Sequence, residues 1–282
     1  MRRRTALAGL VGVCLTLAVA SGCSAGTPEA RDNRSPEATA QPRSAPTTAS
    51  PASPAPRVGS CHRLSLEHAT VPTDERPPVP CRSAHTTVTV RVGHFDPVRD
   101  GHLVSVDSRS VQQQISERCP SRLLRVLGGS REDRRLSRFT VVWFSPTAEQ
   151  AQAGATWFRC DVLALAGRDR LTKLPTHVRG LLDRPHALNR FGTCGTAAPD
   201  SPHFDRVTCS HRHRWRAVSV IALPGTADFH SGPAGATANA RCKQVAADAS
   251  GGALKFTWAF EWPTRQQWRS GQRYGFCWLP TR

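Results

Sequence analysis

Hydrophobic and polar residues alternate along one stretch in each half of the chain. A period of two residues is typical of a β-strand, because successive side chains point to opposite faces of a sheet. The apolar positions are Val88, Val90 and Val92 in the first half and Val218, Val220 and Ala222 in the second. In the first half, Thr87, Thr89 and Arg91 occupy the opposite face. We therefore predict a half-buried strand in each half.

A spacing of about four residues follows each predicted strand and is typical of an amphipathic helix. In the first half Val111, Ile115 and Cys119 fall on one stripe, and Pro120 is expected to break or kink the helix. In the second half the helix is predicted over residues 236–248 and ends at two glycines. Its inward positions are Ala238, Cys242, Val245 and Ala246.

Two segments of 22 residues, 139–160 and 256–277, repeat each other. They share Phe, Thr, Pro, Thr, Gln, Gly and Cys in register, and Trp157 in the first aligns with Tyr274 in the second. The expected strands span residues 139–144 and 256–261, the expected turns or short helices begin at Pro146 and Pro263, and a final strand in each segment carries its last cysteine. An internal repeat of this kind predicts one structural unit made twice.

Each half thus has the order strand–helix–strand–strand, which predicts an α+β fold with the helix packed on one face of a sheet. We expect two tandem small domains, over residues 58–187 and 188–282. The charged and aperiodic residues 167–190 are predicted to connect the two copies.

The first residues of the chain have the features of a bacterial export signal. Three arginines precede an apolar stretch, Thr5–Ala20, that is too short to span a bilayer. The stretch ends in Ala20-Ser21-Gly22-Cys23, where small residues before a cysteine are similar to a lipoprotein signal. We expect residues 1–22 to be removed and Cys23 to carry a lipid such as palmitate; an ordinary cleaved signal peptide is the alternative.

Residues 23–57 are dominated by Ala, Pro, Ser and Thr and contain no aromatic residue. Such a composition buries too little apolar surface to offset chain entropy, so a disordered tether is predicted. A tether after a lipidated cysteine would hold the folded part away from the bilayer. We therefore expect the protein on the extracytoplasmic face of the cell membrane, anchored by its lipid.

The chain carries a net charge of +17, with 35 arginines against three lysines, and both halves are basic. Nucleic acid is not the expected partner, because an exported protein seldom meets it. Anionic lipid headgroups or acidic wall polymers are the natural counter-surface. The alternative explanation is compositional, since a GC-rich genome encodes many arginines.

Eight cysteines follow Cys14 and Cys23, in two sets of four. An even number of cysteines in small exported domains predicts disulfides, and four cysteines allow three pairings in each set. We favour first-with-second and third-with-fourth, because the first pair closes a short excursion and the second attaches the helix to the last strand. The expected bridges are Cys61–Cys81, Cys119–Cys160, Cys194–Cys209 and Cys242–Cys277.

The motifs occur in an ordered series. Val-Gly-Ser-Cys stands at residues 58–61, the second cysteine of each set is followed closely by histidine, and each repeat closes with Pro-Thr-x-x-Gln-x-x-x-Gly-x-x-aromatic-x-x-Cys. This series resembles the septum formation family of actinobacterial envelope proteins, over residues 58–165 and again over 191–279. The family commonly has Pro before that histidine and Glu three residues after it. This chain departs from the pattern at Ala84, Val88, Arg212 and Arg216.

The resemblance implies a link to cell division in the envelope and supplies no biochemical activity. His85 and His213 occupy matching positions before the predicted strands and are candidate binding or pH-responsive groups. We favour a structural role, in which each histidine hydrogen-bonds the loop closed by the nearby disulfide. His203, Cys209, His211 and His213 raise the question of a metal site. Because Cys209 is expected in a disulfide, no metal and no other cofactor is predicted.

Five of the seven tryptophans lie in the second half. Trp215 and Trp268 have charged neighbours, so we expect them to be exposed and able to bind a sugar or a polymer by stacking. For the other tryptophans, core packing is the simpler role. The chain contains no H-E-x-x-H, G-x-S-x-G or S-x-x-K motif, and no catalytic residue is predicted.

The sequence therefore predicts a non-enzymatic, lipid-anchored envelope protein that binds a wall polymer or an exported protein domain. One alternative is a wall-acting hydrolase with an acid-lined cleft between the two copies. The other is a sensor of a soluble ligand that uses His85 and His213 as readouts.

Overall fold

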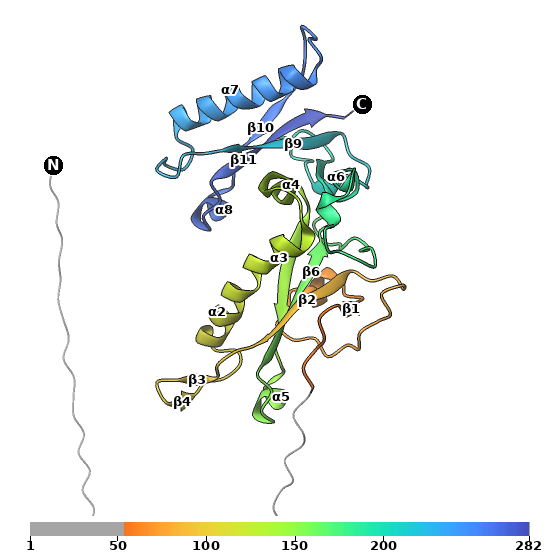
Figure 1. Cartoon of the computed structure of the whole chain (residues 1–282). Helices are drawn as coiled ribbons and strands as arrows, with labels where there is room; N and C mark the ends of the chain where they lie inside the picture. The colour runs from red at the N-terminus through yellow and green to blue at the C-terminus, as the bar shows by residue number, and fades with distance from the viewer. Residues whose placement is uncertain (1–53, 282) are drawn as a thin grey trace, which may run out of the picture. The chain divides into compact units, whose positions relative to one another are not determined.

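Two antiparallel sheets form the framework of the computed structural model, which describes residues 54–281 (Figure 1). The predicted signal peptide, Cys23 and most of the predicted tether lie outside the described residues. The first sheet has the strand order β1-β2-β6-β5 and the second the order β10-β11-β9-β7-β8. Helices and strands occur together in both halves, so the α+β prediction is confirmed.

The strands of the first half are β1 (Cys61–His62), β2 (Thr87–His94), β3 (Val98–Arg99), β4 (His102–Leu103), β5 (Phe139–Phe144) and β6 (Trp157–Ala164). Its helices are α1 (Leu66–Ala69), α2 (Arg109–Arg118), α3 (Pro120–Leu127), α4 (Arg131–Leu136) and α5 (Ala148–Gln152). The remaining elements are η1 (Leu181–Asp183), α6 (Ala187–Phe191), β7 (Thr193–Gly195), β8 (Arg206–Thr208), β9 (Trp215–Ala222), α7 (Gly232–Ala249), β10 (Ala259–Glu261), α8 (Arg265–Arg269) and β11 (Tyr274–Pro280).

The strands of the two halves follow one order. Read from the same edge, the first sheet is β5-β6-β2-β1 and the second begins β10-β11-β9-β7. In each sheet the final strand of the repeat, β6 or β11, lies between two antiparallel neighbours. The second sheet adds β8 at its edge, and β10 is three residues long, so residues 256–258 are not in the strand predicted for them.

The shared Thr, Gln and Gly of the repeat form the same short helix twice. Thr147 and Thr264 are the N-caps of α5 and α8, and each makes a capping box with the glutamine three residues later. The two glycines that follow have φ of 93° and 87°, a backbone conformation that favours glycine. Because each threonine takes the N-cap position, the preceding proline lies before the helix, and the prediction that Pro146 and Pro263 begin it was wrong.

The longer helices cover one side of each sheet (Figure 1). Val111, Ile115 and Cys119 are at most 1 % exposed, which confirms the predicted stripe. The prediction of a break is also confirmed, since α2 ends before Cys119 and α3 starts at Pro120. In the second half α7 is longer than predicted, and its buried residues are Ala234, Ala238, Cys242 and Ala246.

Four disulfides join the pairs that we favoured from the sequence. They are Cys61–Cys81, Cys119–Cys160, Cys194–Cys209 and Cys242–Cys277. The second and fourth attach a helix to an inner strand of its sheet, β6 or β11. The first and third close the loops that lead into β2 and β9. Each bridge contributes about 3–4 kcal/mol in the chain-entropy model, which matters for sheets this small.

Burial in the first half extends further than the sequence pattern predicts. The polar face of β2 is not solvated at its start, because Thr87 and Thr89 are at most 1 % exposed and donate hydrogen bonds to the buried Asp161. Residues 167–190 do more than connect the two halves, since they bury apolar side chains against the first sheet. Those side chains are Leu174, Val178, Leu181 and Leu182.

The two halves contact each other through α4 and the second sheet. Leu136 of α4 is buried in a cluster with Ala217, Phe276 and Trp278. Glu132 accepts hydrogen bonds from the Ser219 hydroxyl (2.6 Å) and the Val220 backbone N–H (3.0 Å). The Glu132 carboxylate thus binds β9 beyond the point where the neighbouring strand β7 ends.

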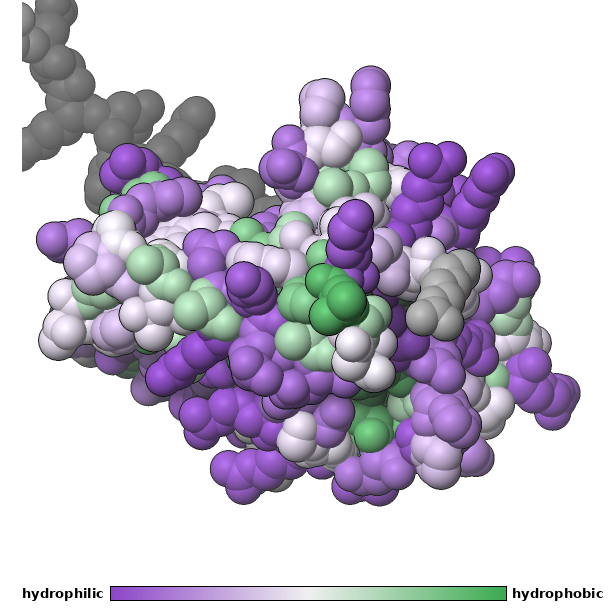
Figure 2. Space-filling model, turned by 90° about the horizontal axis from the view of Figure 1, so that it is seen from above, coloured by the Kyte–Doolittle hydropathy of each residue, from purple (hydrophilic) through white to green (hydrophobic). Residues whose placement is uncertain are grey.

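The face seen from above is mostly hydrophilic, and its hydrophobic residues form small separate spots (Figure 2). The large hydrophobic side chains that are exposed among the described residues are Val58, Val71, Val98, Leu103 and Leu254. Of the helices within residues 54–281, none combines the length and the apolar character needed to cross a bilayer.

Candidate functional site

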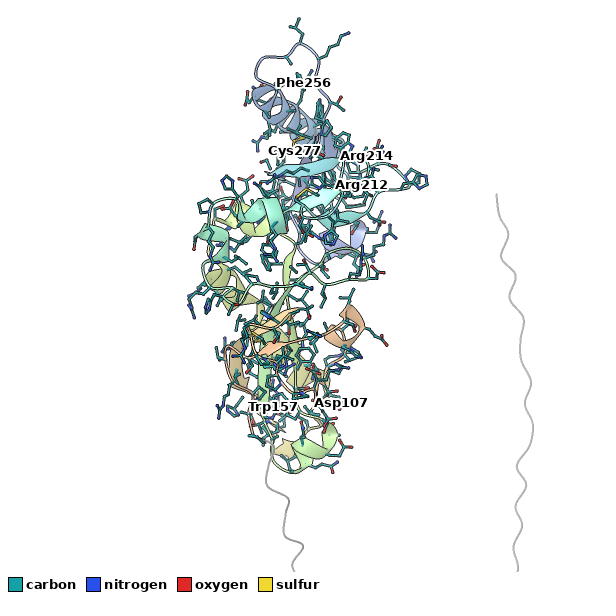
Figure 3. The ribbon with its side chains drawn as sticks, turned by 90° about the vertical axis from the view of Figure 1, so that its right-hand side faces the viewer. Asp107, Trp157, Arg212, Arg214, Phe256 and Cys277 are labelled. Atoms are coloured by element: carbon teal, nitrogen blue, oxygen red, sulfur yellow. A yellow bond between two sulfur atoms is a disulfide. The ribbon has the colours of Figure 1, made fainter. Side chains whose placement is uncertain are left out.

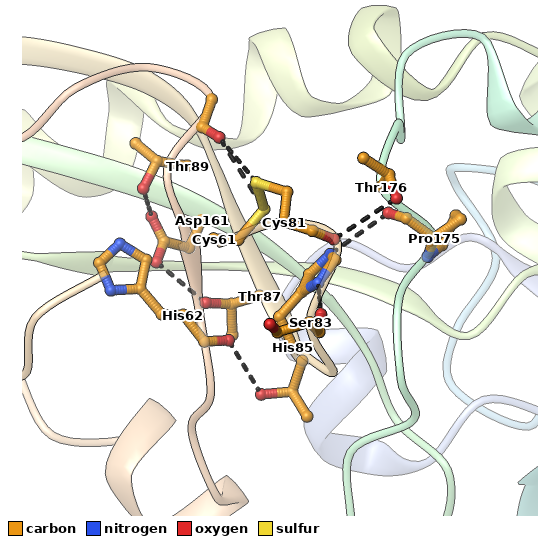
Figure 4. The surroundings of a disulfide bond; sticks show 12 residues. Cys61, His62, Cys81, Ser83, His85, Thr87, Thr89, Asp161, Pro175 and Thr176 are labelled. Carbon is orange, nitrogen blue, oxygen red and sulfur yellow. Dashed lines mark hydrogen bonds between the residues drawn. A yellow bond between two sulfur atoms is a disulfide. The ribbon is translucent and has the colours of Figure 1, made fainter. Parts of the chain in front are cut away.

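His85 lies between two loops in the first half of the chain (Figure 4). Its side chain is buried, with Nδ1 2.8 Å from the carbonyl oxygen of Ser83 and Nε2 3.3 Å from that of Pro175. The ring therefore connects the turn that follows Cys81 to the segment after β6. Both ring nitrogens thus contact backbone carbonyl oxygens, as we expect for a histidine with a structural role.

His213 makes a similar local contact in the second half. Its Nδ1 lies 2.6 Å from the carbonyl oxygen of His211, two residues earlier, as His85 Nδ1 does with Ser83. His211 itself contacts the Thr208 hydroxyl at 2.8 Å, and Cys209 is bonded to Cys194. Within residues 54–281 no group of three or more His, Cys, Asp or Glu side chains is arranged to hold a metal ion.

The two tryptophans proposed as a binding surface are packed into the protein. Trp268 is 9 % exposed, stacks on Trp262 with ring centroids 5.8 Å apart, and is covered by the Arg273 guanidinium at 4.0 Å from its ring centroid. Its predicted exposure was wrong, because α8 turns the ring toward the core although its neighbours are charged. Trp215 is half-buried beside the cluster that contains Leu136.

Solvent-facing charge next to Trp215 comes instead from the turn before β9. Figure 3 places Arg212 and Arg214 close to each other in that turn, and both side chains are exposed.

A groove of about 410 Å³ lies where α4 meets β11. We call it the arginine groove and define it by its lining residues Arg131, Arg134, Arg135, Ser137, Phe139 and Tyr274. The first three belong to α4 of the first repeat, and Tyr274 begins β11 of the second. The groove therefore exists only because the two halves contact each other.

Local sequence fixes the direction of the arginines. Ser130 caps α4 and forms a capping box with Asp133, which sets the start of the helix. Leu136 turns one side of α4 into the apolar cluster, and the arginines lie outside that cluster. The short helix is thus oriented at both ends, by its cap and by its buried leucine.

Two of the three α4 arginines are held in place. Arg134 Nη1 donates to the carbonyl oxygens of Gly129 (2.5 Å) and Gly128 (3.3 Å), while its buried Nε has no acceptor among the described residues. The Arg135 guanidinium lies over the Tyr274 ring, 4.2 Å from its centroid, in a cation–π contact. Arg131 is exposed.

The carboxylates near the groove are bound to other groups. Glu132 accepts from Ser219 and Val220, and Asp133 accepts from the Ser130 backbone N–H at 2.8 Å. Hydrogen bonds from Ser130 hold the pKa of Asp133 below its usual value. Glu261 pairs with Arg206 and accepts from the Trp278 indole at 3.0 Å. Among residues 54–281, no carboxylate lies within ion-pair distance of the three α4 arginines.

Two further arginines, Arg138 and Arg206, add positive charge near the groove. Arg138 donates from Nε to the Leu165 carbonyl oxygen at 3.1 Å, and burial together with repulsion from Arg206 lowers its pKa to about 10. Burial raises the pKa of Tyr274, while Arg135 and Arg206 act in the opposite direction. The phenol therefore sits in a positive field, and the arrangement is suited to bind an anion.

A second polar cluster is buried in the first half, and we call it the Asp74 cluster. Arg159 Nη2 donates to Asp74 at 2.6 Å, and its Nε lies 3.4 Å from Asp161. Asp161 also accepts from the Thr87 and Thr89 hydroxyls, at 3.2 and 2.8 Å, as Figure 4 shows. The cluster consists of His62, Asp74, Thr87, Thr89, Arg159 and Asp161. It fixes the loop that carries Asp74 to the central strand β6.

Burial shifts the titration of two members of this cluster. It raises the pKa of Asp161 to about 6, against the opposing effects of Arg159 and the two threonine hydroxyls. It lowers the pKa of His62 to about 4, and Arg159 adds to that shift. In the second repeat the positions of Arg159 and Asp161 are taken by Phe276 and Trp278, so no equivalent cluster is built there.

Sequence reasoning missed both the arginine groove and the Asp74 cluster. Arg159 and Asp161 interrupt the otherwise apolar residues of β6, and this was a usable signal for a buried ion pair. The four arginines in residues 131–138 were a signal of charge only. No residue near these arginines in the sequence indicates that Tyr274 lies beside them.

One comparison with known proteins gave a match. The model of the family described as Septum formation matches residues 58–277, which is more than half of the chain. The matched stretch includes both repeats as one continuous region. No curated protein and no solved structure matches the chain.

Proposed function

Because the chain belongs to the septum formation family, its role is in the cell envelope and related to cell division, and we propose that it acts there as a non-enzymatic binding protein. In this proposal a lipid on Cys23 holds it to the outer face of the cell membrane. Residues 23–57 serve as the tether that lets the folded part reach its ligand. The ligand is a wall component or an exported protein domain.

The arginine groove is the observation that carries this proposal. It collects guanidinium groups from α4 beside an aromatic ring, and the nearby carboxylates are engaged elsewhere. A concave site whose guanidinium groups form no direct ion pair with a carboxylate binds anionic groups without any need for a reacting residue. The groove also depends on both halves of the chain, which gives the duplication a function.

The two alternatives fit the same residues less well. A wall-acting hydrolase was expected to have an acid-lined cleft between the copies, whereas the groove at the α4–β11 contact has arginine, serine and aromatic walls. A sensor based on His85 requires that the imidazole reach a ligand, whereas this ring is buried against two backbone carbonyls.

Two measurements on the native protein test the proposal. Intact-mass analysis of the membrane-extracted protein, before and after reduction and alkylation, should show a lipid adduct on Cys23 and eight cysteines that react only after reduction. Affinity capture from crosslinked envelopes should retain wall fragments or a protein partner, and a Cys23→Ala variant should be released from the membrane. The proposal fails if the protein is neither retained on purified cell wall nor crosslinked to a partner.

A further inference from the structure

We infer that the arginine groove binds the phosphate groups of an anionic envelope polymer, in which polyol or sugar units separate successive phosphodiesters. This inference rests on the proposed function, because it names the ligand class of the binding protein proposed above.

The first argument is the excess of positive charge at the groove. Arg131, Arg134 and Arg135 line it, the charge of Arg206 acts on its wall residue Tyr274, and Glu261 pairs with Arg206. Glu132 and Asp133 accept hydrogen bonds from neutral donors and form no direct ion pair with the α4 arginines, although, besides the hydrogen bonds from Ser130, the charge of Arg134 helps to lower the pKa of Asp133. The repulsion between Arg138 and Arg206 shows that positive charge accumulates at this contact. An anion in the groove relieves that repulsion.

The second argument is the geometry of the donors. A guanidinium presents a planar fork of N–H groups that matches two oxygens of a phosphate. The Arg135 guanidinium lies over the Tyr274 ring, 4.2 Å from its centroid, so its position is restrained before a ligand arrives. Arg134 is fixed by hydrogen bonds from Nη1 to two glycine carbonyl oxygens. The donors are thus preorganised, which lowers the entropic cost of binding.

The third argument concerns size and walls. A volume of about 410 Å³ falls within the range of about 300–1,000 Å³ that holds ligands larger than a single inorganic ion. Phe139 and Tyr274 provide aromatic walls, which suit the carbon backbone that lies between phosphates in a polymer.

A bilayer surface fits the groove less well than a polymer does. Insertion into lipid relies on exposed apolar side chains. None of the large hydrophobic side chains that are exposed within residues 54–281 lines the groove. A flexible chain can enter a concave site at the contact of two sheets, so we commit to the polymer.

Isothermal titration calorimetry tests the inference. It measures how tightly the full-length chain binds a poly(glycerol phosphate) oligomer of defined length. The test variant is Arg131→Ala/Arg135→Ala. The matched control is Arg212→Ala/Arg214→Ala, which removes the same charge from the exposed turn before β9 (Figure 3). We expect the groove variant to bind about tenfold more weakly or worse and the control to stay within about twofold. Arg135→Lys keeps the positive charge but loses the planar set of guanidinium N–H donors, so this variant should bind the oligomer with intermediate affinity.

The position of the ligand can be read directly, because Tyr274 is the only tyrosine of the chain. Labelling with ring-¹³C tyrosine gives one NMR signal at the wall of the groove. That signal should shift with poly(glycerol phosphate) and stay unchanged with an equal charge of polyglutamate. Unfolding curves of both double variants check that the fold is kept.

Several results overturn the inference. One is an equal loss of affinity in the groove variant and in the control, which would mean that only net charge matters. Another is equal or tighter binding of polyglutamate, and a third is groove-dependent binding to phosphatidylglycerol vesicles with none to the polymer. If the groove variant still binds purified cell wall as the wild type does, the inference fails while the proposed function stands. If the wild type binds neither wall nor a partner protein, the proposed function fails first.

Discussion

The Asp74 carboxylate has two arginine partners in different surroundings, and this contrast gives a sharp prediction. Arg159 reaches it at 2.6 Å with a side chain that is 4 % exposed, whereas Arg76 reaches it at 3.1 Å with a side chain that is 42 % exposed. The carboxylate itself is fully buried. We predict that Arg159→Met destabilises the protein strongly and that Arg76→Met hardly changes its stability.

The magnitudes follow from burial. Removing one partner of a buried ion pair leaves an uncompensated charge and costs about 3–5 kcal/mol. In Arg159→Met, both Asp74 and Asp161 lose their buried cation, and the contact of the guanidinium with Phe144, 4.4 Å from its ring centroid, is lost as well. An ion pair that is open to solvent contributes about 0–1 kcal/mol, because water and salt screen it. Methionine keeps most of the arginine stem at both positions.

Urea unfolding at pH 7 with the disulfides intact measures both free energies of unfolding. A third variant isolates the cause: Asp74→Asn in the Arg159→Met background removes the orphaned charge and should recover part of the loss. The reasoning would be refuted by losses for Arg159→Met and Arg76→Met that agree within about 1 kcal/mol. It would also be refuted if Asp74→Asn recovered nothing in that background.

Three further predictions concern the same fold. His62 has a folded-state pKa of about 4 against its ordinary value of 6.5, so its contribution to stability is lost as the pH falls from about 6.5 toward 4. In urea titrations at several pH values, His62→Gln should remove that decline in stability. An unchanged dependence of stability on pH in this variant would contradict the prediction. Asp161 has a raised folded-state pKa of about 6, so it makes the protein less stable as the pH rises from 3.8 toward about 6, the opposite direction to His62. Asp161→Asn should remove that loss of stability. A variant whose stability depends on pH as the wild type's does would count against the prediction. Gly93→Ala should cost about 1–3 kcal/mol, because the added Cβ would lie 2.6 Å from the Phe158 ring; a neutral effect on the melting temperature would show that the ring can move aside.

The parts of the fold that depend on neighbouring residues could be predicted from the sequence. The stripe through Val111, Ile115 and Cys119 and the break at Pro120 follow from helix geometry, which acts within a few residues. The repeated proline indicated the two short turns or helices, although the capping role of the following threonine and the place of the proline before the helix were missed. The disulfide pairing followed from a short spacing for the first and third bridges, and from the predicted helix and last strand for the second and fourth.

The parts that depend on distant residues could not be predicted. Thr87 and Thr89 look solvated in the alternating pattern, but Asp161 on the paired strand β6 buries them. Trp268 looks exposed beside arginine, but the side of α8 that faces the core is set by the sheet below it. The arginine groove joins α4 to Tyr274 across the contact of the two halves, and hydrophobic periodicity carries no information about that contact.

Co-sedimentation with purified cell walls, measured across a series of salt concentrations, tests the central claim most directly. The account predicts that the full-length wild type sediments with walls and that rising salt releases it, because phosphate contacts are made against competing ions. It predicts that Arg131→Ala/Arg135→Ala is released at much lower salt, whereas Arg212→Ala/Arg214→Ala follows the wild type. Identical salt curves for the two double variants, or no sedimentation of the wild type at any salt concentration, would contradict the account.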